Sequence, residues 1–200
     1  MDVTGIVLAG GRATRMGVLK QGLELSGRTL LQRTVDACLY AGCSRVAVLA
    51  PDQEAAAFLR DDDRVLVTLE DPPGGGPVAG IVAGLAALQP SPDGQVWLLA
   101  CDLPRVAELL ASLQAMELGD DRAWVPVDGD GWPQFLAARY PAGLLRRAVG
   151  DSPQLRDISV RRLLRDVERI PVSLPDALLA DVDSPDQARA AGIRLDRPRG

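Results

Sequence analysis

Residues 7–20, with the sequence VLAGGRATRMGVLK, decide how the fold of this chain begins. An apolar run leads directly into two glycines, and three cations but no acid follow them: Arg12, Arg15 and Lys20. Gly10 and Gly11 permit positive φ angles and let backbone N–H groups approach an anion closely, while the cations supply charge-assisted hydrogen bonds. The stretch therefore predicts a strand, a tight turn and a binding site for a triphosphate.

The rest of the chain alternates β-branched apolar runs with segments of helical periodicity, which is typical of a parallel sheet with crossover helices. Predicted strands lie at residues 5–8, 46–50, 65–69, 96–100 and 124–127. Predicted helices lie between them, at residues 30–41, 54–60, 78–88 and 107–118. Thr29 is suited to cap the first helix and Gly42 to end it. The predicted fold class is α/β, a Rossmann-like three-layer αβα sandwich.

The sheet changes character in the second half of the chain. The sequence DGDG at 128–131 predicts a tight turn, and residues 134–140 a strand that pairs with its predecessor as a hairpin. A mostly parallel sheet thereby becomes mixed. Further elements are predicted as helices at 142–149 and 160–166, a short strand at 169–172, and a closing helix capped by Ser184. We expect a single domain over residues 1–193 and a frayed tail at 194–200.

Composition favours a cytoplasmic globular protein. The 200 residues are near the usual size of one α/β domain. The longest apolar run is far shorter than the roughly 20 residues that span a membrane, and Asp2 stands where a signal peptide carries basic residues. The net charge of −5 disfavours nucleic-acid binding through phosphate contacts. We therefore expect neither a membrane nor a nucleic acid as partner.

The reactive side chains exclude several kinds of chemistry. The chain has no histidine, which rules out Ser-His-Asp and Cys-His catalysis and histidine-ligated metals. Cys38, Cys43 and Cys101 lack the spacing of a zinc site or a disulfide framework, so we expect buried free thiols. Any reaction must therefore use carboxylates, cations and backbone amides.

The phrase LAGGxxxRMGxxK, at residues 8–20, resembles the signature of nucleotidyltransferases that activate small molecules with a nucleoside triphosphate. Three later segments are similar to the family motifs G-P-L-A-G-[IM], C-D-[ML]-P and N-[VI]-N-T-P: GPVAGI at 76–81, ACDLP at 100–104 and DVDSP at 181–185. They occur in the family order over nearly the whole chain. The family that the chain resembles most is that of the molybdenum cofactor guanylyltransferases, which implies a nucleotide-diphospho-sugar transferase-like fold.

The resemblance also implies which residues act. By matching position, three residues would be catalytic: Arg15, Lys20 and Asp102. The nucleotide would be held by a larger set: Leu8, Ala9, Gly10, Gly11, Lys20, Asp71, Gly76, Gly80 and Asp102. Physical chemistry supports these roles, because phosphoryl transfer needs cations and N–H groups on the phosphate oxygens. A carboxylate such as Asp71 accepts hydrogen bonds from a ribose or a base.

Asp102 is the expected ligand of Mg²⁺. It follows the predicted strand at 96–100 and so projects from the carboxyl edge of the sheet, where open α/β folds bind ligands. Magnesium usually takes one or two carboxylates and completes its shell with phosphate oxygens and water. Asp183 is the second predicted ligand. Two other interpretations stay open: Asp102 could cap the turn before Pro104, and Asp183 could belong to the helix cap at Ser184.

For this family the implied reaction is the transfer of GMP from Mg-GTP to the phosphate of molybdopterin, with release of pyrophosphate and formation of a guanine dinucleotide. The acceptor needs no general base, because the second pKa of a phosphate monoester lies near 6. The expected ligands are a nucleoside triphosphate, with GTP favoured, and a molybdopterin-type phosphate. Transient contacts with proteins of cofactor biosynthesis or with molybdoenzymes are a further expectation.

The sequence departs from the family pattern at several positions. Leu19 replaces an aspartate, Pro51 an asparagine, and Asp181 and Asp183 replace asparagines, while the segment before Gln134 lacks the usual arginine. These changes affect specificity more than phosphate chemistry. Two alternatives therefore remain: a cytidylyltransferase or other small-molecule phosphate nucleotidyltransferase, and a catalytically degenerate nucleotide-binding regulator.

Overall fold

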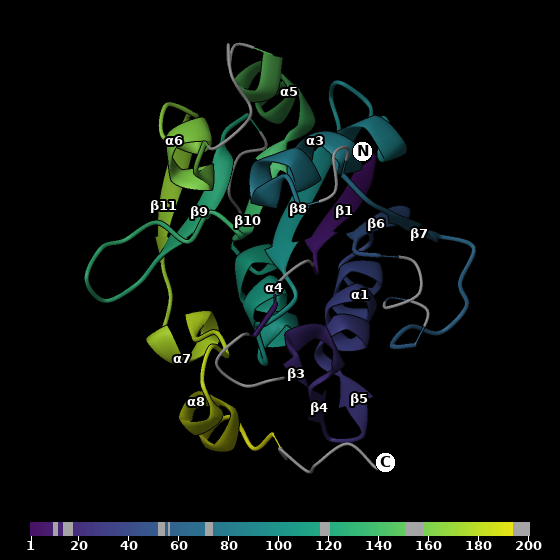
Figure 1. Ribbon diagram of the computed structural model, residues 1–200. Helices are drawn as coiled ribbons and strands as arrows, with labels where there is room; N and C mark the ends of the chain where they lie inside the picture. The colour runs from purple at the N-terminus through teal and green to yellow at the C-terminus, as the bar shows by residue number, and fades with distance from the viewer. Residues whose placement is uncertain are drawn as a thin grey trace.

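The computed structural model describes residues 1–9, 12–13, 18–51, 55, 57–70, 74–116, 121–150 and 158–193. Its main strands form one seven-stranded sheet in the order β11-β9-β10-β8-β1-β6-β7 (Figure 1). Their bounds are Val3–Leu8 for β1, Arg45–Leu49 for β6, Val65–Thr68 for β7, Gln95–Ala100 for β8, Ala123–Val127 for β9, Ala137–Pro141 for β10 and Arg169–Ser173 for β11. β10 runs antiparallel to both of its neighbours, and the other pairings are parallel. The predicted mixed sheet is confirmed.

Helices cover both faces of this sheet. One face packs against α1 (Leu30–Tyr40) and α4 (Val106–Gln114), and the other against α3 (Gly76–Leu88), α5 (Ala142–Gly150) and α6 (Val160–Leu164). Successive strand residues point to opposite faces: Val7 belongs to the first core, and its neighbour Ile6 to the second. The central strands are therefore apolar throughout, and the three-layer α/β prediction is confirmed.

The ends of α1 follow the predicted capping chemistry. The Thr29 hydroxyl accepts a hydrogen bond from the backbone N–H of Gln32 at 3.1 Å. At the other end, Gly42 has a φ of 88°, and its N–H donates to the carbonyl of Leu39 at 3.1 Å. Only glycine adopts this backbone conformation without strain.

Among the described residues, no helix is both long and apolar enough to cross a bilayer.

Several predicted bounds were wrong. α4 ends at Gln114 and α6 at Leu164, earlier than predicted. β10 begins at Ala137 because Gln134 bonds back to the carbonyl of Pro126 and forms a turn with Ala137. The predicted helix at 54–60 falls partly outside the described residues; of the rest, Ala55 is helical and Phe58 lies in a turn. The predicted tail at 194–200 lies outside them altogether.

Two small hairpins after β1 were not predicted. β2 (Arg12–Ala13) pairs antiparallel with β3 (Val18–Leu19), and a single 3₁₀ turn, η1 (Lys20–Gly22), follows. β4 (Glu24–Leu25) then pairs with β5 (Arg28–Thr29) through Ser26 and Gly27, both of which have positive φ. Two positive φ angles are the signature of a tight hairpin turn that matches strand twist. These hairpins place Lys20 at the carboxyl end of β1.

The last part of the chain returns to the same end of the molecule. α7 (Asp176–Leu179) was not predicted, whereas α8 (Pro185–Ala190) is the closing helix that the sequence predicts. Figure 1 shows α8 at the end of the molecule where β4 and β5 lie. A small apolar cluster joins them: Leu23, Leu30, Val182, Ala188 and Ile193. Burial of this cluster holds the segment around Val182 against the start of the chain.

Candidate active site

Lys20 and Asp102 meet at the carboxyl edge of the sheet. The Lys20 ammonium (Nζ) lies 2.9 Å from Oδ2 of Asp102, although 82 residues separate them in sequence. Lys20 follows β1 and Asp102 follows β8, and these strands are parallel neighbours with Leu8 opposite Ala100. From β1 the chain proceeds outward through β6 and β7 and returns to β8 on the other side. The contact therefore lies at a topological switch point, where open α/β sheets bind ligands.

Asp183 reaches the same ammonium from the end of the chain, through a hydrogen bond from Lys20 Nζ to its Oδ1. Its position is fixed by Val182, which is buried and whose N–H donates to the carbonyl of Asp102 at 3.1 Å. This backbone bond places the residues on both sides of Val182 next to the end of β8. Three segments that are remote in sequence therefore converge on Lys20.

Asp102, Asp181 and Asp183 form a cluster of carboxylates. Each offers one oxygen atom, and the three oxygens lie within 4.8 Å of one another. Hard divalent cations such as Mg²⁺ prefer all-oxygen donor sets of this kind, together with phosphate oxygens and water. We call these three residues the carboxylate cluster. Its chemistry fits a divalent cation, and it contains both predicted metal ligands together with Asp181.

The helix cap at Ser184 does not exclude a metal-ligand role for the Asp183 side chain. Ser184 caps α8, since its hydroxyl accepts from the N–H of Gln187 at 3.2 Å. The Gln187 side chain accepts in return from the N–H of Asp183 at 2.9 Å. This reciprocal arrangement satisfies two backbone donors at the helix start. The backbone of Asp183 thus takes part in the cap while its carboxylate faces Lys20.

The electrostatics of the site reflect crowded carboxylates around one ammonium. Burial lowers the pKa of Lys20, but hydrogen bonds to Asp183 and Asp102 outweigh burial, so the net pKa is raised. Burial raises the pKa of Asp181, and the charges of Asp183 and Asp102 raise it further. Both shifts indicate an excess of negative charge at this point. A further cation would relieve it.

A cavity of about 700 Å³ opens beside the carboxylate cluster. This volume suits a small-molecule ligand. Its apolar lining comes from Leu103, Phe135, Leu136, Val160 and Leu179. Its acidic lining comes from Asp102, Asp128, Asp130, Asp176 and Asp181. Among the described lining residues there is neither lysine nor arginine, so the cavity offers mainly hydrogen-bond acceptors on an apolar floor.

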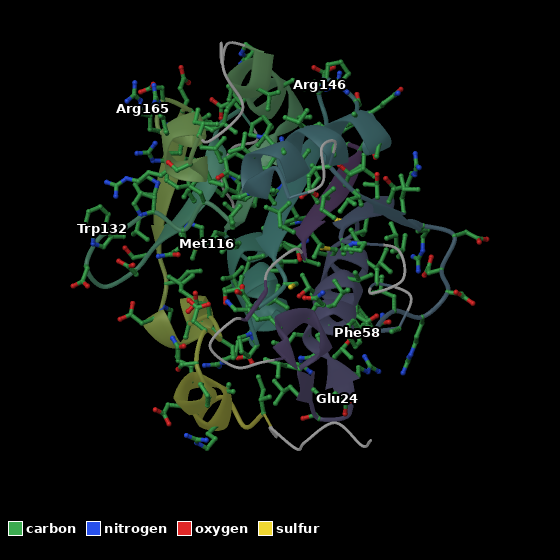
Figure 2. All side chains as sticks on the ribbon, viewed as in Figure 1. Glu24, Phe58, Met116, Trp132, Arg146 and Arg165 are labelled. Carbon is green, nitrogen blue, oxygen red and sulfur yellow. The ribbon has the colours of Figure 1, made fainter. Side chains whose placement is uncertain are left out.

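One wall of the cavity is a hydrogen-bonded turn between β9 and β10. Oδ1 of Asp128 accepts from the N–H groups of Trp132 at 2.8 Å and Asp130 at 3.1 Å, and Oδ2 accepts from the Gln134 amide at 2.9 Å. The N–H of Gly129 donates to Asp176 at 2.7 Å, which ties the turn to α7. Figure 2 shows Trp132 at the outer edge of the molecule, on this turn.

The other predicted site residues divide into three groups. Leu8 ends β1 and Ala9 follows it, and the Ala9 N–H donates to the carbonyl of Leu49 at 3.1 Å. Gly76 begins α3 with a φ of 83° and is exposed, whereas Gly80 is buried and a Cβ there would lie 2.9 Å from Leu8. Gly80 thus allows close packing of α3 on β1. The remaining group lies outside the described residues: Gly10, Gly11, Arg15 and Asp71.

Some residues of the site were not predicted. The sequence favoured Asp183 over Asp181 as a ligand, but both belong to the carboxylate cluster. The sequence did contain a signal for the cavity wall at Asp128 and Gln134, because an acidic turn follows the predicted strand at 124–127. Asp176 had none, since it lies on the four-residue helix α7, which is too short to show a period.

Comparison with known proteins is consistent with this geometry. Residues 5–174 match the family model described as the MobA-like NTP transferase domain. The chain belongs to this family. It is 32% identical to the probable molybdenum cofactor guanylyltransferase of Synechococcus elongatus over 184 residues, which cover 90% of this chain and 93% of that protein. It is also 32% identical to the molybdenum cofactor guanylyltransferase of Rhodopseudomonas palustris, over 96% of this chain and 92% of that protein.

This MobA-like protein has the fold of solved relatives. The crystal structure of Rv0371c from Mycobacterium tuberculosis superposes with a TM-score of 0.71 at 23% identity, covering 94% of this chain and 96% of that one. The same mycobacterial protein has been solved in complex with manganese. The predicted family, the predicted fold class and the assignment as a nucleotidyltransferase are confirmed.

Proposed function

We propose that this nucleotidyltransferase transfers GMP from GTP to the phosphate of molybdopterin and releases pyrophosphate. The observation that carries the proposal is the contact of Lys20 with Asp102 at the switch point, beside the carboxylate cluster and the 700 Å³ cavity. Relatives that match over nine-tenths of the chain are named molybdenum cofactor guanylyltransferases. Their names support the choice of base and acceptor.

The nucleotide would lie on the β1 side of the site. Backbone groups from Leu8 to Gly11 would approach it, and Arg15 and Lys20 would hold its phosphates with charge-assisted hydrogen bonds. Asp71 would accept from the nucleoside. Gly76 is exposed and carries no Cβ, so it would leave room for a planar base. Gly80 would act indirectly, because it lets α3 pack closely on Leu8.

We propose Mg²⁺ as the cofactor, held by Asp102 and Asp183 with Asp181 beside them. The oxygen donor set fits this ion, and a solved relative binds manganese. A divalent cation bound there supplies positive charge to the triphosphate oxygens. Lys20 supplies a second positive charge, which the chain itself contributes.

The chemistry requires little of the protein beyond placement. An oxygen of the acceptor phosphate forms a bond to the α-phosphorus of GTP. The bond between the α-phosphorus and the α,β-bridging oxygen breaks, and pyrophosphate leaves with the electron pair of that bond. The acceptor is already ionised at neutral pH, which suits a chain without histidine. Lys20 stabilises the charge that grows on the phosphate oxygens.

The cavity suggests how the acceptor is oriented. An anion is repelled by five carboxylates, so the acceptor phosphate would remain at the Lys20 end. The aminopyrimidinone edge of a pterin carries several N–H donors, which match acceptors such as Asp130 and Asp176. The ring itself would cover Phe135 and Leu179 on the apolar floor. The heterocycle would thus enter the cavity first.

The direct test supplies the purified protein with Mg²⁺, molybdopterin and each of GTP, CTP, ATP and UTP in turn, and measures pyrophosphate together with the mass of the product. We expect release with GTP only, a guanine dinucleotide as product, and release that is slower on the order of 10²-fold or more from an Asp102→Asn variant. A preference for CTP would replace the guanylyl assignment by a cytidylyl one. Absence of pyrophosphate release with all four nucleotides would contradict the proposed transfer and favour a nucleotide-binding regulator.

A further inference from the structure

Lys20 is the only lysine in a chain with 22 basic side chains. The other 21 are arginine, so one position alone combines a positive charge with the compact shape of an ammonium group. A guanidinium is a planar fork, whereas an ammonium is a point charge with three rotatable donors and resembles a simple cation. This single lysine contacts two members of the carboxylate cluster.

The ammonium contacts two of the carboxylates that a metal would need. Lys20 Nζ donates to Oδ2 of Asp102 and to Oδ1 of Asp183. These two residues also belong to the cluster whose oxygens lie within 4.8 Å of one another. A hard cation binds carboxylates by direct contact with their oxygens, and an ammonium in their midst repels it. Lys20 and a divalent cation therefore compete for Asp102 and Asp183.

We infer that the Lys20 ammonium occupies the cation site in the nucleotide-free protein and leaves Asp102 and Asp183 for the polyphosphate when the metal binds. The inference rests on the metal site of the proposed function. The metal alone then binds weakly, because it must displace Lys20. Metal and polyphosphate strengthen each other's binding, because the phosphates receive the displaced ammonium.

The surroundings are suited to such an exchange. Asp183 exposes 53% of its side chain, compared with 18% for Asp102 and 15% for Lys20, so the Asp183 side of the contact is open to solvent. The carboxylates do not depend on Lys20 for their backbone positions, because Val182 is bonded to the carbonyl of Asp102 and Ser184 caps α8. Only one flexible side chain has to move.

The first test measures the binding of Mg²⁺ and of Mn²⁺ to nucleotide-free protein by isothermal titration. Methionine has nearly the length of lysine but no charge, so Lys20→Met frees the carboxylates. We expect this variant to bind either ion about tenfold more tightly than the wild type. The control is Arg189→Gln, which removes a cation paired with Asp186 on α8 and should leave the affinity unchanged. Equal or weaker binding by Lys20→Met overturns the inference.

The second test needs no variant. Protein labelled with ¹³C only at lysine gives side-chain signals from Lys20 alone, and relaxation of the carbon next to Nζ reports its mobility. We expect saturating Mg²⁺ to make this carbon more mobile, and inorganic tripolyphosphate to order it again. A lysine that stays equally ordered at saturating Mg²⁺ overturns the inference. Neither test uses turnover, so a protein that displaces Lys20 but fails to transfer GMP contradicts only the proposed function.

Discussion

Asp102 contacts Lys20 and contributes to both the carboxylate cluster and the cavity. Because of these shared contacts, the loss of either charge should remove transition-state stabilisation. We predict that Asp102→Asn and Lys20→Ala each lower kcat/KM on the order of 10²-fold or more. Pyrophosphate release measures the rate, and urea unfolding verifies that each variant is folded. A variant that keeps near-normal rates would remove that residue from the mechanism.

For single residues, part of the site was predictable from the sequence. The meeting of Lys20 and Asp102 follows from two parallel strands whose carboxyl ends share one edge of the sheet. The membership of Asp181 was not decided by the sequence, because it depends on a backbone bond between Val182 and Asp102 that joins residues far apart in sequence. No local pattern encodes such a bond.

Among the elements, α3 depends on glycines where it crosses β1. A Cβ on Gly84 would lie 2.9 to 3.1 Å from three atoms of Ile6, which is fully buried and branched at its own Cβ. We predict that Gly84→Ala lowers the free energy of unfolding by about 1–3 kcal/mol through overpacking. Urea denaturation measures the loss.

The matched control for this variant is Gly150→Ala, at the end of α5, where a Cβ would meet no atom within 4 Å. Alanine at an open helical position is expected to be neutral or to stabilise by up to about 1 kcal/mol. If both variants lost the same stability, the cost would come from the backbone and not from the contact of α3 with β1.

The cap of α8 should affect both stability and metal binding. Ser184→Ala removes an N-cap, at a cost of about 1 kcal/mol, and loosens the backbone of Asp183. We predict this loss of unfolding free energy together with weaker Mg²⁺ binding, measured by urea denaturation and isothermal titration. Ser159→Ala is the control, because Ser159 caps α6 with the same chemistry, on a helix that supplies no member of the carboxylate cluster. Identical Mg²⁺ affinities of the two variants would show that the cap of α8 does not affect metal binding.

Elements were predictable where periodicity extends over several residues. The central strands and α1, α3 and α5 carry long apolar patterns, and their existence and type follow from these patterns. The pairs β2–β3 and β4–β5 have two residues per strand, and α7 has four residues in all. Such short pieces show no period, so their structure depends on contacts made elsewhere in the fold.

For the whole molecule, the sheet face covered by α1 and α4 must stay closed to keep the thiols buried, because all three cysteines belong to that core. Cys38, Cys43 and Cys101 are free and buried, as predicted, and burial raises the pKa of the Cys101 thiol to about 12. A thiol with this pKa is almost entirely protonated at pH 8, and the thiolate is the reactive form. We predict that a disulfide reagent at pH 8 labels no cysteine rapidly in the native protein and all three after unfolding. A native Cys101 that reacted quickly would show that the end of β8 opens.

The residues of the site come from segments spread over nearly the whole chain. It takes Lys20 from the hairpin segment near the start, Asp102 from the middle of the sheet, and Asp181 and Asp183 from the segment before α8. The third apolar cluster joins the first and last of these segments through Leu30 and Val182. These four side chains therefore come together only when the early, middle and late segments of the chain have all folded.

The most direct measurement is a structure determined with Mg²⁺ and a GTP analogue whose α,β-bridging oxygen is replaced by carbon, so that transfer is blocked. The account predicts one metal-bound polyphosphate between Lys20 and Asp102, with the Lys20 ammonium on a phosphate oxygen and Asp102 on the metal. A polyphosphate bound elsewhere, or one that contacts neither residue, would contradict it.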